Sequence, residues 1–475
     1  MKNVFKRVGA SLTAHRVSLT SGIMIVAMAV GMLFTSCSGS KEDSLAAALP
    51  QDAIAVGRVD IKKLSEGDHL LADVIKMYVS EDMVKESGVD VKTPAYVFAH
   101  QNYGGCIFSL RDEDSFWKYT KADAEAQRGL KWANINGEFL IATDGKRAML
   151  VGPANSSEQD KLRNNVSTWM KQTKCSVSKD LMKALDKGDG FFTMAASYDN
   201  LPSMLTREFV KQGIDLSGIC VYADMSLTRK EAALVVGTVG SNKYLEKMLK
   251  LNASKRIDGS LAGAYGDRPF VQGEASCNGE KFLETLNTVY KQVPEFTQAW
   301  EMINSMVDVE TVIKSLDGEC GFVVPEFTRR GIPDVLVMAN VKDEKFMKDV
   351  DKWNGVLSQF GGMQLSPFRG NVYELAGIGM PLYFGTQNKQ MVLTTNKEML
   401  DVKPKGKSAL PKDVKGSYGY VCVDLAPTNL WERVWQEFPL LNLAPGKVKD
   451  IQDFTRLLIV AEDNTRVRFS LGTWE

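Results

Sequence analysis

The sequence predicts an α+β protein in which two tandem halves each combine an antiparallel sheet with helices packed on one face. Three observations predict this class. Apolar and polar residues alternate over many short stretches, as in half-buried strands. Segments with helical apolar spacing follow several of these stretches. The order of strands and helices in residues 50–250 then recurs in residues 258–475, which indicates an internal duplication.

The first half opens with an alternating strand over 53–61 and a helix over 62–79. Residues 130–152 predict a three-stranded meander, because Asn136-Gly137 and Asp144-Gly145 are strong hairpin signals whose turn positions favour positive φ. The other elements expected in this half are strands at 94–98, 105–110, 190–196, 219–227 and 231–239, and helices at 112–127, 156–173 and 200–212.

The second half repeats this order. Its turn at Gln387-Asn388-Lys389 lies where Asp144-Gly145-Lys146 lies in the first meander. The expected elements are a strand and helix in 270–292, strands at 321–324 and 335–341, a helix at Phe346, a meander at 371–395, a strand at 419–425 and a hairpin over 456–472. The match is one of pattern and not of identity, so two independent halves with a similar element order stay an alternative.

Several expected helices begin in the same way. An Asn or Asp lies at or just before the expected start of the helix, and an aromatic–apolar pair follows within its first turn, as in Asn242-Lys-Tyr-Leu and Asn278-Gly-Glu-Lys-Phe-Leu. A short side chain that carries an oxygen can cap the free backbone N–H groups of the first turn. We therefore expect a strand–cap–helix module that recurs at about 114, 242, 280 and 344.

The N-terminus has the features of a secretory signal. Residues 1–17 carry Lys2, Lys6, Arg7 and Arg16 and no acid, and Ser21–Phe34 is an uncharged, mostly apolar stretch. This stretch is shorter than the roughly 20 residues that a permanent membrane helix needs. A basic head followed by a short apolar segment is typical of a signal peptide.

The signal ends in Leu33-Phe34-Thr35-Ser36-Cys37, which resembles the lipobox of bacterial lipoproteins. The resemblance implies that a signal peptide over 1–36 is removed, that the Cys37 sulfur carries a lipid, and that its new N-terminus is acylated, for example with palmitate. It also implies a lipid-anchored linker over 37–49. The alternatives are an ordinary signal peptide with a chance cysteine and a retained anchor helix. Two or three acyl chains would hold the protein stably on a membrane.

Lys41-Glu42-Asp43 resembles the tag that marks surface lipoproteins in the Bacteroidetes, although a solvated linker has the same composition. With the lipobox and the paired α+β halves, the chain resembles an uncharacterised family of Bacteroidetes outer-membrane lipoproteins. This resemblance implies an outer-membrane, lipid-anchored location, with the body facing either the cell surface or the periplasm. It implies no activity.

Charge and cysteine usage narrow the function further. The 58 basic and 58 acidic residues balance, which gives no electrostatic reason to bind nucleic acid. Six cysteines follow Cys37, and several lie in apolar strand-like runs. We expect mostly buried free thiols, with disulfides as the alternative for an exported protein.

The usual catalytic motifs are absent from the sequence. It contains no H-E-x-x-H, G-x-S-x-G or P-loop motif, so no metal or cofactor is expected. Only His69 and His100 follow the signal segment, and His100 ends an apolar strand, where a structural histidine is typical. Asp112-Glu113-Asp114 is the densest acidic cluster, and a helix cap explains it.

Trp431 and Trp435 lie four residues apart on an expected helix, so they share a face. If exposed, they could stack on sugar rings; if buried, they belong to the core.

The sequence therefore predicts a lipid-anchored cell-envelope protein that binds a ligand, a glycan or a partner protein without catalysis. The alternatives are a carboxylate-dependent surface glycan hydrolase and an assembly component that binds neighbouring envelope proteins.

Overall fold

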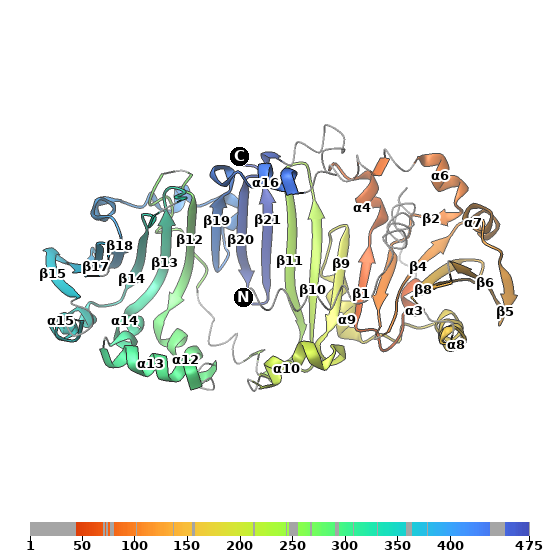
Figure 1. Cartoon of the computed structure of the whole chain (residues 1–475), viewed down its shortest axis with the longest axis horizontal. Helices are drawn as coiled ribbons and strands as arrows, with labels where there is room; N and C mark the ends of the chain where they lie inside the picture. Colours follow the sequence, from red (N-terminus) through yellow and green to blue (C-terminus); the bar gives the residue numbers. More distant parts are fainter. Residues whose placement is uncertain are drawn as a thin grey trace. The chain divides into compact units, whose positions relative to one another are not determined.

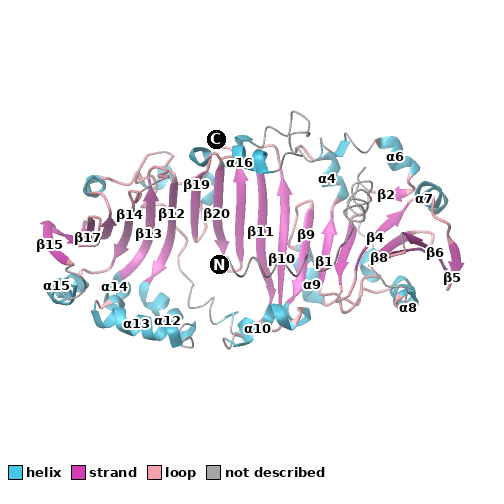
Figure 2. Ribbon diagram, viewed as in Figure 1, coloured by secondary structure: helices cyan, strands magenta, loops and turns pink. Residues whose placement is uncertain are grey.

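The computed structural model describes residues 44–474 apart from gaps at 70–71, 73–74, 77–79, 101, 136, 154–156, 212–213, 244, 247–254, 267, 290–293, 307, 330, 358–362, 378 and 438–451. The chain divides into two compact units. The first unit comprises residues up to 178 together with 190–193, and the second comprises 179–189 together with 194–475. Both units are built on antiparallel strands that helices accompany (Figures 1 and 2).

The sheet of the first unit runs in the order β1-β3-β4-β8-β7-β6-β5, and β2 also pairs with β4. Residues 130–152 form the expected meander β6-β7-β8, with Gly137 and Gly145 at positive φ in its turns. The strands are β1 (Ala55–Val59), β2 (Val89–Asp90), β3 (Ala95–Ala99), β4 (Gly104–Leu110), β5 (Glu125–Gln127), β6 (Leu130–Ile135), β7 (Phe139–Thr143) and β8 (Arg147–Gly152).

Helices lie on both faces of this first sheet. On one face, Phe116 of α7 (Glu113–Thr120) packs with Phe108 of β4 in a core that α4 (Ile61–Glu66) and α6 (Glu81–Glu86) complete. On the opposite face, Trp169 of α8 (Gln159–Met170) meets Phe98 edge to face, with ring centroids 5.9 Å apart. The expectation that helices cover one face is therefore wrong for this unit, because both faces of the sheet carry buried apolar side chains.

The sheet of the second unit runs in the order β10-β11-β21-β20-β19-β12-β13-β14-β18-β17-β16-β15. β9 (Phe192–Ser197), whose last four residues belong to this unit, pairs with β10. Among the described residues β15 pairs with β16 alone, so the sheet is open at that end. The other strands are β10 (Ile219–Leu227), β11 (Glu231–Gly240), β12 (Val271–Asn278), β13 (Leu316–Val324), β14 (Leu336–Val341), β15 (Gln364–Arg369), β16 (Asn371–Ala376), β17 (Leu382–Gln387), β18 (Gln390–Thr394), β19 (Gly419–Asp424), β20 (Arg456–Asp463) and β21 (Arg466–Gly472).

The two faces of the β12–β18 region are covered differently. On one face, Phe346 and Trp353, from η3 (Lys345–Asp349) and α15 (Val350–Leu357), pack over Phe384. On the other face, Leu261 and η4 (Lys397–Asp401) cover Val372, Tyr383 and Val392. The other α-helices described in this unit are α9 (Lys179–Asp186), α10 (Ser203–Lys211), α12 (Gly279–Val289), α13 (Pro294–Met306), α14 (Val309–Ser315) and α16 (Leu430–Glu437).

The expected caps are present at three of the four strand-to-helix junctions. At the fourth, Glu344 makes no side-chain cap, and Asp343 accepts a hydrogen bond from Lys345 N at 3.0 Å. Asp112, Asn242 and Asn278 each accept a hydrogen bond from the backbone N–H three residues later, at distances of 2.6, 2.9 and 3.0 Å. The helix expected over 112–127 is too long, however. It ends at Thr120 because Lys121 adopts the left-handed conformation with φ of 53°, and residues 125–127 then form β5.

Residues 44–49 belong to the folded body. Ser44–Ala47 form α3, and the side chains of Leu45, Ala48 and Leu49 have no exposed surface. The expected linker over 37–49 therefore ends before Ser44, because these apolar side chains are part of the core. A segment with the same beginning, Ser260-Leu261-Ala262, lies just before β12, and Leu261 and Ala262 are also buried.

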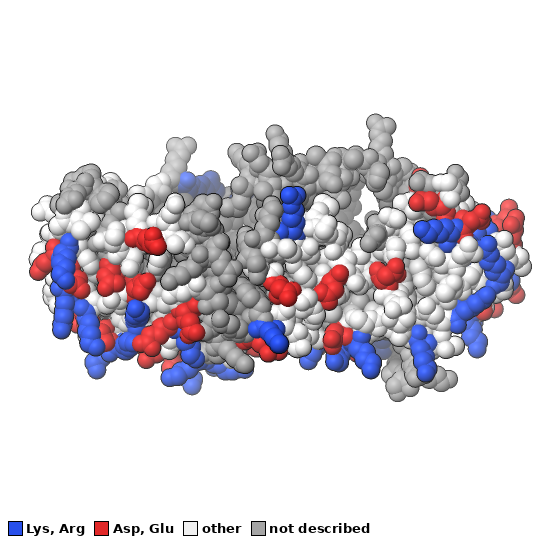
Figure 3. Space-filling view, turned by 90° about the horizontal axis from the view of Figure 1, so that it is seen from below, with Lys and Arg blue, Asp and Glu red and all other residues white. Residues whose placement is uncertain are grey.

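No helix among the described residues is long and apolar enough to cross a membrane. On the face drawn in Figure 3, the described acidic and basic side chains are interspersed.

Candidate functional site

The largest described cavity lies in the second unit, where β11, β20 and β21 meet residues 408–413. Its volume is about 580 Å³. This volume is within the usual range of small-molecule sites. Its polar lining includes Lys230, Glu231, Lys412, Asp413, Arg456, Arg468 and Trp474.

Two half-buried arginines organise this cavity. Arg456 of β20 binds both carboxylate oxygens of Asp413, at 2.9 and 3.0 Å. A paired, planar contact of this kind fixes the guanidinium in one orientation. Asp413 belongs to a short 3-10 helix, so the ion pair joins that segment to the sheet.

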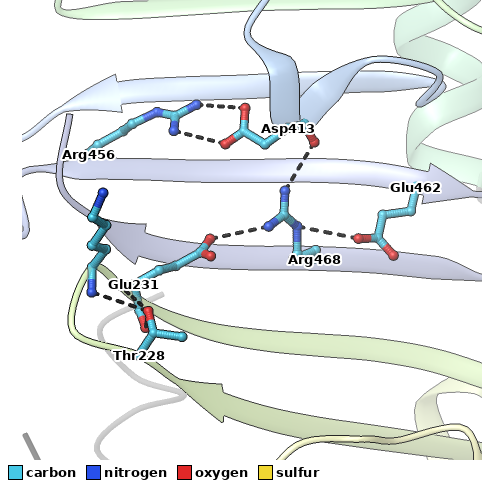
Figure 4. A network of polar contacts seen from close by, with 7 residues as sticks. Thr228, Glu231, Asp413, Arg456, Glu462 and Arg468 are labelled. Carbon is cyan, nitrogen blue, oxygen red and sulfur yellow. Dashed lines mark hydrogen bonds and ion pairs between the residues drawn. The ribbon is translucent and has the colours of Figure 1, made fainter. Parts of the chain in front are cut away.

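Arg468 of β21 contacts three different segments (Figure 4). Its Nη1 lies 3.2 Å from Glu231 of β11, and its Nε lies 3.3 Å from Glu462 of β20. Its Nη2 donates to the backbone oxygen of Asp413 at 3.1 Å. The two arginines and their acids therefore form one connected network around the cavity.

Trp474 supports this network from the C-terminal end. The guanidinium groups of Arg268 and Arg456 lie over its ring, 4.8 and 5.6 Å from the centroid. Arg268 is in turn held by both carboxylate oxygens of Asp424, at 2.7 and 3.0 Å. The indole is thus a cation–π partner of the arginines, and these groups compete with any sugar for its ring.

Cations outnumber acids in the lining of the cavity. Lys230, Lys412, Arg456 and Arg468 carry positive charge, whereas Glu231 and Asp413 carry negative charge. Both lysines are exposed, and the described part of the chain places no ion-pair partner beside either one. An anionic group at the mouth would meet two lysines whose charges are not already neutralised.

A second, smaller cavity of about 260 Å³ lies in the first unit and contains His100. The Nε2 of His100 is 3.0 Å from Asp52, and its ring stacks on Tyr103 with centroids 4.3 Å apart. No serine hydroxyl contacts His100 among the residues that the structure describes, so the pair lacks a nucleophile there. His69 is structural, because its ring nitrogens contact Lys63 O and Ala72 N, each at 2.9 Å.

The structure also brings together two buried glutamates that are far apart in sequence. Glu319 accepts hydrogen bonds from the backbone N–H groups of Asp258, Gly259 and Ser260 and from the Ser260 hydroxyl. Glu274 accepts from Leu261 N at 3.1 Å and is hydrogen-bonded to Glu319. The pair therefore binds residues 258–261 to the sheet.

The two carboxyl groups have opposite protonation preferences. Burial, followed by the hydrogen bond with Glu319, raises the pKa of Glu274 to about 8. Burial alone would raise the pKa of Glu319 as well, but hydrogen bonds from Glu274, Ser260 and Gly259 outweigh it and hold this pKa at about 2. Split pKa values also occur in glycosidase acid pairs. Here, however, the side chains are only 3% and 4% exposed and are occupied by the 258–261 backbone, which favours a structural role.

The acidic cluster Asp112–Asp114 is also structural. Asp112 caps α7, and Glu113 accepts a hydrogen bond from Gly145 N at 3.1 Å and pairs with Lys131 at 2.8 Å. No group of three or more His, Cys, Asp or Glu residues in the described ranges is arranged to hold a metal ion.

The other residues predicted from sequence are placed only in part. Trp431 of α16 is half-buried, and its indole N–H donates to Phe454 O at 2.9 Å. The side chain of Trp435 lies outside the described residues, so the shared face with Trp431 stays a prediction. Cys37, Lys41, Glu42 and Asp43 also lie outside them.

Sequence reasoning did not identify the arginine network. One local signal was present, because Arg466 and Arg468 are two apart in a strand and therefore share a face. The partners Asp413, Glu231 and Glu462 come from three separate segments, and no sequence pattern links them.

Comparison with known structures gives weak similarity. Crystal form I of TP0453 has a TM-score of 0.26 and 9% identity, and the match covers 43% of this chain and 81% of that one. Crystal form III has a TM-score of 0.25 and 10% identity, with coverage of 46% and 89%. Similarity at this level supports no conclusion about fold or function. No curated protein matches the sequence.

A family model does match most of the chain. The model describes a domain of unknown function, DUF4836, and aligns with residues 72–458. This range includes most of the first unit, the acid pair and Arg456. The chain therefore belongs to the DUF4836 family.

Proposed function

We propose that this protein is a non-enzymatic binding module of the bacterial cell envelope, held to the outer membrane by lipid on Cys37. The basic and apolar N-terminus and the lipobox-like Leu33–Cys37 support the anchor. Six residues separate Cys37 from Ser44, where the folded body begins at the latest. Six extended residues span at most about 20 Å, so the body would be held close to the lipid surface.

The anchor can be tested by fatty-acid labelling of cells that produce either the natural chain or Cys37→Ala. We expect lipid on the natural chain alone. Labelling of both chains, or of neither, would reject Cys37 as the lipid site. Protease treatment of intact cells, with Lys41, Glu42 and Asp43 replaced by Ala in a second strain, then tests surface export. Degradation of the natural protein with protection of the variant would identify a surface protein exported by this tag.

The binding site we propose is the cavity around Arg456 and Arg468, and its ligand is an anionic saccharide. The observation that supports this most strongly is the excess of cations in a cavity whose guanidinium groups are already held in place. Groups ordered before binding lose little entropy when a ligand arrives. The mixture of charged and hydroxyl-bearing lining residues also suits a ligand rich in hydroxyl groups, because Ser408, Ser470 and Thr473 line the same space.

The ligand class can be tested with purified protein, a polymer of uronic acids and neutral dextran. We expect binding to the acidic polymer that weakens as salt is added. Lys230→Glu/Lys412→Glu should weaken binding about tenfold, or about 1.4 kcal/mol, because it reverses both uncompensated charges at the mouth. Lys415→Glu is the matched control, since Lys415 is exposed nearby but does not line the cavity. Equal loss in the control and the double variant would reject this site.

We further infer that the chain arose by duplication of a strand–helix unit, with halves near 50–250 and 258–475. The strand order β1-β3-β4-β8-β7-β6-β5 has the same form as β12-β13-β14-β18-β17-β16-β15. β10–β11 and β20–β21 are hairpins in corresponding places. The buried Ser-Leu-Ala segments at 44 and 260 each precede the first strand of this order.

Matching glycines in the first strand of each order support the same inference. Gly57 in β1 pairs with Val97, and Gly273 in β12 pairs with Phe322. A Cβ added at either position would lie 2.5–2.6 Å from the side chain of that partner. The two strands therefore share a close approach that only glycine allows.

The alternative of a carboxylate-dependent glycan hydrolase stays a prediction. The buried pair Glu274 and Glu319 does not favour it, because both side chains are covered by residues 258–261.

A further inference from the structure

Two cysteines in the second unit face each other across adjacent strands. Cys277 lies in β12 opposite Gly318, and Cys320 lies in β13 opposite Ala275. Residues two apart in a strand point to the same side, so both thiols are on one face as diagonal neighbours. Both residues are half-buried, which leaves part of each side chain accessible to solvent.

The local backbone favours contact between the two sulfurs. Gly318 has a φ of +118°, and the pairing of β13 with β14 changes register between Leu316 and Cys320. An irregularity of this kind increases the local twist of a strand. Gly318 places no side chain of its own opposite Cys277, and the side chain nearest to the position that its Cβ would take is Asn340, at 3.3 Å.

The two thiols are hydrogen-bonded to each other. This hydrogen bond lowers the pKa of Cys277, against the opposing effects of burial and of Asp317. The same hydrogen bond, together with burial, raises the pKa of Cys320. Cys277 is therefore the thiol that ionises first, and the thiolate is the reactive form of cysteine.

We propose that Cys277 and Cys320 are a redox-active pair that closes to a disulfide by exchange with a small-molecule disulfide such as oxidised glutathione. In the first step the Cys277 thiolate attacks one sulfur of the small disulfide, which forms a mixed disulfide and expels one thiolate. Cys320 then loses its proton and attacks the Cys277 sulfur, which releases the second small thiol. Two protein thiols are oxidised, and one disulfide is reduced to two thiols.

The other described cysteines are poorer candidates for this reaction. Cys220 and Cys422 are buried, and burial raises the pKa of the Cys106 thiol to about 12. Cys175 is exposed and would react as a single thiol, so it should be removed as Cys175→Ser before the test. An exported protein would meet the oxidising conditions under which such a pair closes.

The test uses the purified Cys175→Ser chain, exposed to oxidised glutathione at neutral pH and then blocked with N-ethylmaleimide under unfolding conditions. We expect the loss of two maleimide-reactive thiols and, after proteolysis, a cross-linked peptide that joins Cys277 to Cys320. Dithiothreitol should restore both thiols. Because this measurement needs no change to either cysteine of the pair, it does not depend on how their variants fold.

Two single variants then separate the roles of the thiols. Cys320→Ser should stop at a stable glutathione adduct on Cys277, whereas Cys277→Ser should leave Cys320 reduced. The proposal is overturned if both thiols stay reduced in the parent chain. It is also overturned if the parent accumulates the same stable adduct as Cys320→Ser, because Cys320 would then fail to resolve it.

Discussion

Replacing Glu274 by glutamine should remove a specific part of the pH dependence of stability. The folded protein raises the pKa of Glu274 from its ordinary value of 4.5 to about 8. The stabilisation that comes from a raised pKa is fully present when the pH is below the pKa of the unfolded state. It is lost as the pH rises through the pKa of the folded state. Between these two values the folded state holds one proton that the unfolded state releases.

The size of the effect follows from this proton. Stability should fall by about 1.4 kcal/mol for each pH unit in this window. From pH 5.5 to pH 8 the loss is about 3 kcal/mol, allowing for partial ionisation near the folded pKa. Glu319 adds no slope here, because its folded pKa of about 2 leaves it ionised in both states. Glutamine cannot ionise, and its amide N–H can still donate to Glu319.

The assay is urea unfolding at pH 5.5 and pH 8, combined with hydrogen exchange of the Gly259 and Leu261 amides. The exchange measurement reports on residues 258–261 themselves. This matters because the chain has two compact units, and urea unfolding does not say which of them responds to pH. The natural chain should lose protection at residues 258–261 as the pH rises. Glu274→Gln should lose less, because the only raised carboxyl pKa left in this cluster is that of Asp258, which its hydrogen bond with Glu319 raises. Glu398→Gln, a change at an exposed glutamate, is the control and should behave like the natural chain. Equal slopes in the natural chain and Glu274→Gln would refute the reasoning.

Three further predictions concern stability. Arg468→Met should destabilise the second unit by about 2–3 kcal/mol, because it leaves Glu231 without its cation and Glu462 with Arg466 alone. The melting of this variant should be compared with that of Arg329→Met. Gly273→Ala should lower the free energy of unfolding by about 1–3 kcal/mol, because its Cβ would lie 2.5 Å from Phe322 Cε1. Gly355→Ala, where an added Cβ meets no atom within 4 Å, should cause no loss in the same thermal melt. Asp112→Ala should cost about 1 kcal/mol by removing the cap of α7, and Asp112→Asn should recover most of that loss in urea unfolding.

Features that depend on neighbouring residues were predictable from the sequence. The turns at 143–146 and 387–389 form as expected, because their backbone conformations are set by Gly145, Asn388 and Lys389 at positive φ. The helix caps at Asp112 and Asn278 are equally local. The end of α7 at Thr120 was missed, because the left-handed Lys121 carries no glycine signal.

Features that combine distant segments required the folded chain. The alternating pattern predicts that a strand has a buried face, but it does not say which element covers it, so α8 on the second face of the first sheet was not foreseen. Nothing in the sequence distinguishes Glu274 and Glu319 from other charged residues, and the same is true of the partners of Arg468. Their pKa values and ion pairs arise only when strand pairing brings them together and excludes water.

The sequence alone was enough to predict strands, turns, caps and a signal-like N-terminus, since each depends on interactions within a few residues. The tertiary structure decided which strands are neighbours, which thiols touch and where charges gather around a cavity. These outcomes depend on contacts between residues tens to hundreds of positions apart, such as Glu231 with Arg468, and local preference does not specify such contacts.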